Sequence, residues 1–305
     1  MRIGYACINT TLAKEKIQVN RSMIRRTFLE KGLSYASELA LSNVTDLEKI
    51  IDWNISNKIL LYRMSSDMFP WMSEYEIDQL PDFENIKNRL EVIGEKASRL
   101  KLRLTYHPGP FNVLASHNPG VIKKTVKELR QHGEVMDLMR LPRTPYAKIN
   151  IHVGGAYGDR LSAIARFIRN VALLPDTVRS RLTVENDDKA NMFSVTDLLA
   201  IHEQTGVPIV FDYHHHTFRT GDLTAEEAML LAHETWPRGI TPLVHYSSSR
   251  KRYEDPASSE ASHADFVYEP LNLYGRKADI MLEAKAKEIA AIRFMRENGA
   301  LAPAL

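Results

Sequence analysis

The sequence has a single cysteine, Cys7, so no disulfide can form within the chain. It also has no stretch that approaches the roughly 18–20 uninterrupted apolar residues of a membrane span, so we expect no association with a membrane. Acidic and basic residues nearly balance, with a net charge of +2. A strongly basic protein is thereby excluded, and any surface that binds nucleic acid must be a local patch.

The turn after the first expected strand has no glycine, whereas a dinucleotide-binding protein needs a glycine-rich turn at this place. The first apolar run continues into ACINTTL at residues 6–12, which has no glycine, so a dinucleotide site is disfavoured. Low-complexity tracts, short repeats and linkers are also absent. The chain has 305 residues, 44% of them hydrophobic, and is long enough for one large core. We expect one domain over residues 1–298 and a frayed tail over residues 299–305.

Short apolar runs rich in β-branched residues alternate with longer amphipathic segments. Eight such units in about 300 residues favour a closed (β/α)8 TIM barrel, with a doubly wound open sheet as the alternative. The expected strands are residues 2–7, 58–62, 103–106, 147–151, 181–184, 208–211, 242–245 and 280–282. The expected helices include residues 22–31, 45–54, 83–100, 119–132, 160–174, 195–205 and 225–235.

Residue types that bind metals stand at the ends of six consecutive expected strands. In a barrel, the C-terminal ends of the strands line one shared mouth. Each residue alone has an ordinary explanation, such as a solvated loop position or a carboxylate near a helix N-terminus. Because a residue type that binds metals stands at the end of all six strands, we favour a metal site. The residues are His107, His152, Glu185, Asp212 with His215, His245 and Glu283.

The set combines imidazoles and carboxylates without thiolates, which suits Zn, Mn, Fe or Co. Its members are too many for one ion, so we expect two or three ions that share carboxylates, an arrangement used to hydrolyse phosphate esters. Within FDYHHH at residues 211–216, Asp212 and His215 are the candidate ligands. His214 and His216 are expected either to support the ligands or to face solvent.

Nine motifs together resemble the UV damage endonuclease family. They are GYACIN (4–9), YRMSSDMFP (62–70), HPGPF (107–111), IHVGGAYGDR (151–160), LTVENDD (182–188), FDYHHH, VHYSSSR (244–250), SHADF (262–266) and MLEAKAKE (281–288). The resemblance implies a metal-dependent TIM barrel, related to endonuclease IV, that nicks DNA immediately 5′ to a photolesion. The ligands that it implies are His107, His152, Glu185, Asp212, His215, His245, His263 and Glu283; His263 comes from the resemblance alone.

The resemblance also implies residues that contact the lesion and the DNA backbone. Tyr5 and Asn9 are the implied lesion probes, although from the residues alone Tyr5 could simply pack and Asn9 could cap a helix. Phe111 retains the aromatic residue of HPGPF, whereas Pro110 replaces the usual glutamine. Arg160 and Arg250 are candidates for phosphate contacts, with a solvated charged loop as the alternative for the run at residues 250–252.

Two further positions depart from the family. Glu74 stands where a histidine ligand is usual, so it is a candidate carboxylate ligand. Leu243 stands where the family often has a lysine that is carboxylated to bridge metals, so that bridge is absent. The catalytic set that we expect is Glu185 and Glu283 as bridging carboxylates, with His245 and Lys285.

The expected cofactors are two or three divalent ions, manganese first, with zinc, magnesium and cobalt as candidates. The expected partner is double-stranded DNA with UV photoproducts, bound by a cytoplasmic monomer that is associated with the nucleoid in a prokaryote. Two alternatives remain open. A sugar isomerase or epimerase of the same barrel superfamily would need fewer ligands, and a metal-binding scaffold would not need Tyr5 and Asn9 at the mouth.

Overall fold

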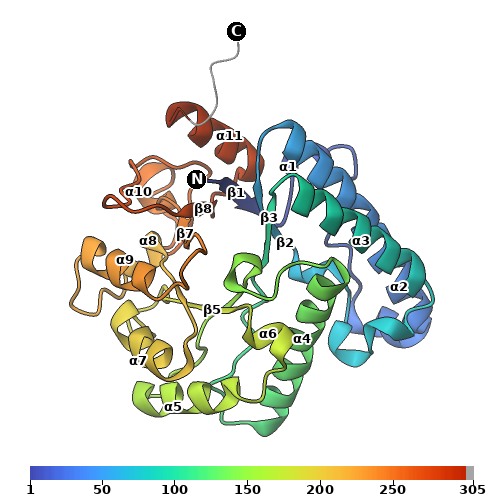
Figure 1. The fold of residues 1–305 in the computed structure, drawn as a ribbon, viewed down its shortest axis with the longest axis horizontal. Coiled ribbons are helices and arrows are strands. Elements are labelled where there is room, and N and C mark those ends of the chain that lie inside the picture. The colour runs from blue at the N-terminus through green and yellow to red at the C-terminus, as the bar shows by residue number, and fades with distance from the viewer. Residues whose placement is uncertain (300–305) are drawn as a thin grey trace.

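Eight parallel strands form a nearly closed barrel in the computed structural model, which describes residues 1–299 (Figure 1). The barrel order is β6-β5-β4-β3-β2-β1-β8-β7, and β6 meets β7 through one parallel bridge between Asp212 and His245. The expected α/β barrel is therefore confirmed over the open sheet. The strands are β1 (Ile3–Ala6), β2 (Leu61–Met64), β3 (Arg103–Tyr106), β4 (Ile149–Ile151), β5 (Leu182–Glu185), β6 (Ile209–Val210), β7 (Leu243–Tyr246) and β8 (Asp279–Leu282).

Helices lie around the outside of the barrel (Figure 1). Within residues 1–299, no helix combines the length and apolar character needed to cross a membrane. The expected tail over residues 299–305 lies, apart from Gly299, outside the described residues. The helices are α1 (Thr10–Ala13), α2 (Arg25–Ser56), α3 (Phe83–Arg99), α4 (Pro119–Leu138), α5 (Arg160–Val171), α6 (Asp176–Arg179), α7 (Val195–Thr205), α8 (Tyr213–His216), α9 (Ala225–Glu234), α10 (Arg250–Tyr253) and α11 (Lys287–Glu297), with short 3-10 turns η1 (Ser66–Met68), η2 (Met72–Glu74), η3 (Ile77–Gln79) and η4 (Pro145–Ala147).

Two expected boundaries near the N-terminus are corrected. The helices expected at residues 22–31 and 45–54 belong to one helical span, α2, which is interrupted at Gly32 with φ of 65°. The second strand begins at Leu61 rather than at residue 58, because Lys58 adopts a φ of 60° and the N–H of Ile59 still bonds to the Asn54 carbonyl of α2. The strand therefore extends two residues beyond its expected end.

Side chains point alternately into and out of the barrel along each strand, so the inward-pointing side chains form layers in the barrel interior. A fully buried ion pair between Arg103 and Asp279 lies at the N-terminal ends of β3 and β8. Above it lies an apolar layer that includes Leu243. This layer is formed by Ala6, Leu61, Val210, Trp236, Leu243 and Met281. The mouth above it is where the polar side chains gather.

The two ends of the chain are joined by buried polar contacts. Asp279 accepts hydrogen bonds from the backbone N–H of Arg2 (2.7 Å) and from the Arg103 guanidinium (3.0 Å). Glu288, also buried, accepts from the backbone N–H groups of Thr10 (2.8 Å) and Thr11 (2.7 Å) at the start of α1. The first and last segments of the barrel are therefore tied together by charge-assisted bonds as well as by β1–β8 pairing.

We predict that Asp279→Ala lowers the free energy of unfolding by about 3–5 kcal/mol, because it leaves the Arg103 charge buried without a partner. Urea unfolding followed by circular dichroism measures the change. Glu30→Ala is the control: it breaks the exposed Arg26–Glu30 pair within α2 and should cost less than about 0.5 kcal/mol. Equal losses in the two variants would contradict the structural role of the buried pair.

Candidate metal centre

The strand ends deliver their imidazoles and carboxylates to one cavity of about 810 Å³ at the mouth. Their ligand atoms fall into three groups, and within each group all atoms lie within 4.8 Å of one another. Glu185 belongs to two groups, so it is positioned to join two ions. The groups are His107 with His152 and Glu185, His215 with His263 and Glu283, and Glu185 with Asp212 and His245.

Distances between the ligand atoms fit a shared cation. His245 Nδ1 lies 3.0 Å from Glu185 Oε1 and 3.3 Å from Glu283 Oε1. Two ligands of an octahedral ion are about 3 Å apart when each bond is about 2.1 Å. His245 Nδ1 and Glu185 Oε1 are buried and form no hydrogen bond with each other or with any other described group. Such unpaired buried atoms are costly, and a divalent ion would satisfy both.

Hydrogen bonds from neighbouring residues orient three of the candidate ligands. The backbone carbonyl of Asn186 lies 2.9 Å from His215 Nδ1, so this nitrogen carries the proton and Nε2 is left as the ligand atom. The Asn186 side chain also bonds to both backbone groups of Asp212, at 2.9 Å each. The Asn150 amide donates to Glu185 Oε2. The three ligands are therefore positioned before any ion binds.

Burial and mutual charge shift the ligands' proton affinities. Burial lowers the pKa of His245 and of His263 to about 4, which favours their neutral forms. For His152 and His215 burial acts in the same direction, but the neighbouring carboxylates outweigh it and raise the pKa to about 10 and about 9, so a cation would have to displace their protons. Burial raises the pKa of Asp212 to about 7. Burial also opposes ionisation of Glu185, but His245 and His152 keep its pKa well below the usual range. A cation at Asp212 would favour its charged form.

FDYHHH is a helix start with one ligand on each side of its first turn. Asp212 caps α8, and its Oδ1 accepts from the backbone N–H of His215 at 2.8 Å. The His215 imidazole lines the cavity, whereas the Asp212 carboxylate belongs to the fully buried group with Glu185 and His245. His214 and His216 are buried rather than solvated, pack against Phe218 and Phe211, and belong to none of the three groups.

Three residues assigned to the site from the sequence lie outside the lining of the cavity. Tyr5 is fully buried, and its hydroxyl donates to Asn54 of α2 at 2.8 Å. Asn9 is buried as the cap of α1, where its Oδ1 accepts from the N–H of Leu12. In this structure both side chains have the contacts that the packing and capping explanations require, and neither is exposed. Glu74 is exposed in η2 and lies outside the three ligand groups.

The other expected DNA contacts differ in how they are placed. Phe111 is 87% exposed, and Pro110 beside it lines the cavity, as does Lys285. Arg160 and Arg250 lie outside the cavity lining. Their nearest acidic partners are Asp197 at 3.9 Å for Arg160 and Asp265 at 3.5 Å for Arg250.

Several residues of the site were not identified from the sequence. Arg63 of β2 forms a partly buried ion pair with Glu283, and both residues line the cavity. Lys148 is fully buried, and its Nζ lies 3.3 Å from His245 Nε2. Burial lowers the pKa of Lys148 well below its usual range, so its neutral amine can accept a hydrogen bond from Nε2–H of His245 when Nδ1 is the ligand atom. The signal was alternation: Lys148, Asn150 and His152 share one face of β4.

Comparisons with known proteins agree on one family. The family model described as UV-endonuclease UvdE matches residues 1–302. The chain is 34% identical over 97% of its length to the UV-damage endonuclease of Schizosaccharomyces pombe, and spans half of that protein. It is 33% identical over 98% of its length to the UV DNA damage endonuclease of Bacillus pumilus and covers 94% of it. The crystal structure of SacUVDE matches with a TM-score of 0.83 at 30% identity, over 99% of this chain and 100% of that one.

We predict that the purified protein retains divalent metal and that Glu185→Gln loses at least one equivalent, because Glu185 contributes to two ligand groups. Metal content after dialysis, measured by inductively coupled plasma mass spectrometry, tests this. Glu74→Gln is the control and should retain as much metal as the wild type. A loss in Glu74→Gln as large as that in Glu185→Gln would contradict the proposed ligand set.

Proposed function

Because the chain belongs to the UV-endonuclease family UvdE, we propose that it nicks double-stranded DNA immediately 5′ to UV photoproducts, leaving a 3′-hydroxyl and a 5′-phosphate. The observation that supports this beyond family membership is the ring of ligand atoms at the barrel mouth, beside the exposed Phe111. Phosphodiester hydrolysis needs charge stabilisation at a fixed point, and an exposed aromatic ring can contact a distorted base step.

The proposed cofactors are two or three divalent ions, with manganese as the first candidate. The donor set of imidazoles and carboxylates fits such ions, and its unpaired buried atoms support their binding. When bound, they would activate a water for attack on phosphorus and stabilise charge on the phosphoryl oxygens. Glu185 and Glu283 are the proposed bridging carboxylates; the other ligands are His107, His152, Asp212, His215, His245 and His263.

Cationic side chains around the proposed ligands compensate part of the negative charge of the carboxylates. Arg63 pairs with Glu283 and keeps that carboxylate ionised and oriented. Lys148 holds His245 from below, whereas the exposed Lys285 faces the cavity and can contact the phosphate that flanks the scissile bond. Arg160 and Arg250 are proposed to contact phosphates farther out, where their acidic neighbours weaken the attraction.

Lesion contact is assigned to Phe111 and Pro110 instead of to the buried Tyr5 and Asn9. Flipping nucleotides out of the stack is less costly at a damaged step, and Phe111 would stack in the space that they leave. Because one chain supplies every proposed ligand, a monomer suffices for the reaction. We propose that it acts on DNA in the cytoplasm, at the nucleoid in a prokaryote.

We predict metal-dependent scission just 5′ of the lesion in a short duplex that carries one UV photoproduct. Matched undamaged and abasic duplexes, each with Mn²⁺ or with a chelator, are the comparisons on a sequencing gel. Glu185→Gln should nick at least 100-fold more slowly, because removing one well-placed stabilising group costs about 10²–10³ in rate. Cutting at the abasic site alone would contradict the photoproduct assignment, and wild-type nicking by Glu185→Gln would contradict the metal mechanism.

Phe111→Ala should lower kcat/KM on the photoproduct duplex by about 5–150-fold, which corresponds to the roughly 1–3 kcal/mol of one base–aromatic stack. Metal content should not change. The control is Val92→Ala, which removes an exposed apolar side chain from α3 and should have no effect on nicking. An unchanged kcat/KM for Phe111→Ala would exclude the ring from lesion contact.

A further inference from the structure

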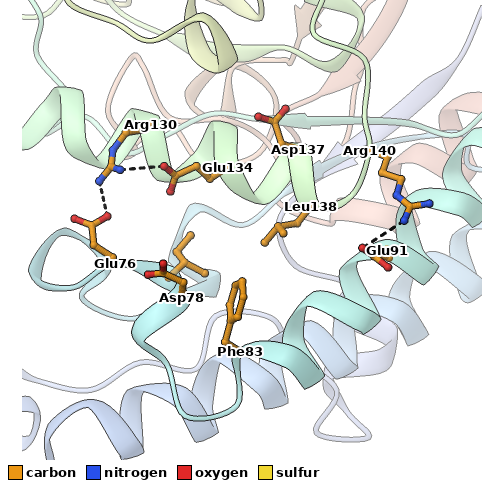
Figure 2. Close-up of a pocket in the computed structure, with 10 residues that line it drawn as sticks. Glu76, Asp78, Phe83, Glu91, Arg130, Glu134, Asp137, Leu138 and Arg140 are labelled. Carbon is orange, nitrogen blue, oxygen red and sulfur yellow. Dashed lines mark hydrogen bonds and ion pairs between the residues drawn. The ribbon is translucent and has the colours of Figure 1, made fainter.

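Two grooves of opposite charge flank helix α4. The groove between α3 and α4 is rich in carboxylates, as Figure 2 shows for Glu76, Asp78, Glu91, Glu134 and Asp137. Its two arginines pair with these acids, as the dashed lines in Figure 2 mark. The groove between α4 and α5 has a similar size, about 630 Å³, but the opposite character.

The groove between α4 and α5 is lined by cations and has no acidic residue in its lining. Lys123 comes from α4, and Arg166 and Arg169 come from α5, three residues apart and so on one face of the helix. Apolar side chains form the remainder of its surface, chiefly Ile122, Val126 and Leu173. The groove therefore presents a positive stripe over an apolar floor.

These cations are not neutralised within the protein. Among residues 1–299, Lys123, Arg166 and Arg169 have no carboxylate within 4.0 Å. Arg166 Nε donates to the backbone carbonyl of Ala115 at 2.7 Å, while its Nη2 is buried and has no hydrogen-bond partner among the described residues. An unpaired guanidinium nitrogen in a groove without acids favours an anionic ligand.

The groove reaches the mouth through one exposed aromatic residue. Tyr157, in the loop after β4, is 53% exposed and contacts His117 edge to face, with 4.6 Å between ring centroids. The Arg166 guanidinium lies 5.6 Å from the Tyr157 ring centroid. His117 and Arg166 line the groove, and Gly155, two residues before Tyr157, lines the metal cavity. The two sites are therefore contiguous along one loop.

We propose that the groove between α4 and α5 binds the phosphodiester backbone of DNA that flanks the lesion, with Lys123 and Arg169 as phosphate contacts. This inference rests on the proposed function. A nucleic-acid strand is the favoured occupant because the cations lie in a row that begins at the mouth, and because the acidic groove on the other side of α4 would repel it. The lining of α4 from Pro119 to Val126 spans about 10 Å, which matches about three base-pair steps.

The test is the salt dependence of duplex binding by Lys123→Gln/Arg169→Gln, measured by fluorescence anisotropy on duplexes of about 30 base pairs that carry one central photoproduct and a non-hydrolysable linkage on its 5′ side, so that the protein binds in one register. Arg166 is left intact because it also holds the Ala115 carbonyl. Loss of two phosphate contacts should reduce the slope of log K against log salt by about 1.8 and weaken binding about 60-fold at 0.1 M salt. Duplexes shortened by a few base pairs from either end identify the end that the groove holds.

The matched control is Arg238→Gln/Lys277→Gln, which removes two exposed charges before β7 and β8, at the end of the barrel opposite the mouth. Unchanged binding by this control, and loss of the variant's defect on the duplex shortened at the correct end, would support the proposal. Equal slopes for the two double variants, or an equal defect on every shortened duplex, would overturn it. Stronger competition for the groove by polyglutamate than by DNA would also overturn it.

A nicking assay distinguishes failure of the groove proposal from failure of the proposed endonuclease activity. Wild-type protein that binds with the expected slope but nicks no damaged duplex would refute the endonuclease proposal and leave the groove assignment standing. Normal nicking of a photoproduct duplex with an unchanged slope in Lys123→Gln/Arg169→Gln would refute the groove alone. Circular dichroism melting of both double variants establishes that either result comes from folded protein.

Discussion

The contact between β6 and β7 closes the barrel, and the same residues belong to the candidate metal centre. Strand β6 has only two residues, and its link to β7 is the bridge between Asp212 and His245, with the His245 N–H donating to the Phe211 carbonyl at 2.9 Å. Asp212 and His245 also share one ligand group with Glu185. The Asn186 side chain continues the pairing between β5 and β6 by bonding to both backbone groups of Asp212. Closure of the barrel therefore sets the distances between the ligands.

Seven of the eight implied ligands could be predicted from the sequence because each follows an apolar run. The ends of parallel strands meet at one edge, so chain position translates directly into position in space. His263 could not be found in this way because it lies in the long excursion between β7 and β8, paired with Ser249 through one antiparallel bridge. A residue in an irregular loop has no periodic signal, and only the resemblance indicated it.

The residues that sequence reasoning missed lie below the strand ends or beside them. Arg63 was overlooked because the second strand was expected to end at Tyr62, the residue before it, whereas β2 continues to Met64. Lys148 alternates with Asn150 and His152 along the expected fourth strand, but a buried amine is so rare that this alternation alone did not mark it as part of the site. The burial of Tyr5 and Asn9 could not be predicted either, because a matching motif gives the order of residues but not whether a side chain faces solvent or packs against α2. Burial depends on packing between segments distant in the chain.

The contacts between the first and last segments of the chain affect how the protein folds during synthesis. Strand β1 pairs with β8, Arg103 needs Asp279, and the first turn of α1 is capped by Glu288. Each of these contacts spans at least 176 residues of sequence. During synthesis, the earliest strand must therefore wait until almost all of the chain has left the ribosome before one of its edges is covered. Such long-range pairing makes folding slow, and the exposed edge gives chaperones a period in which to act.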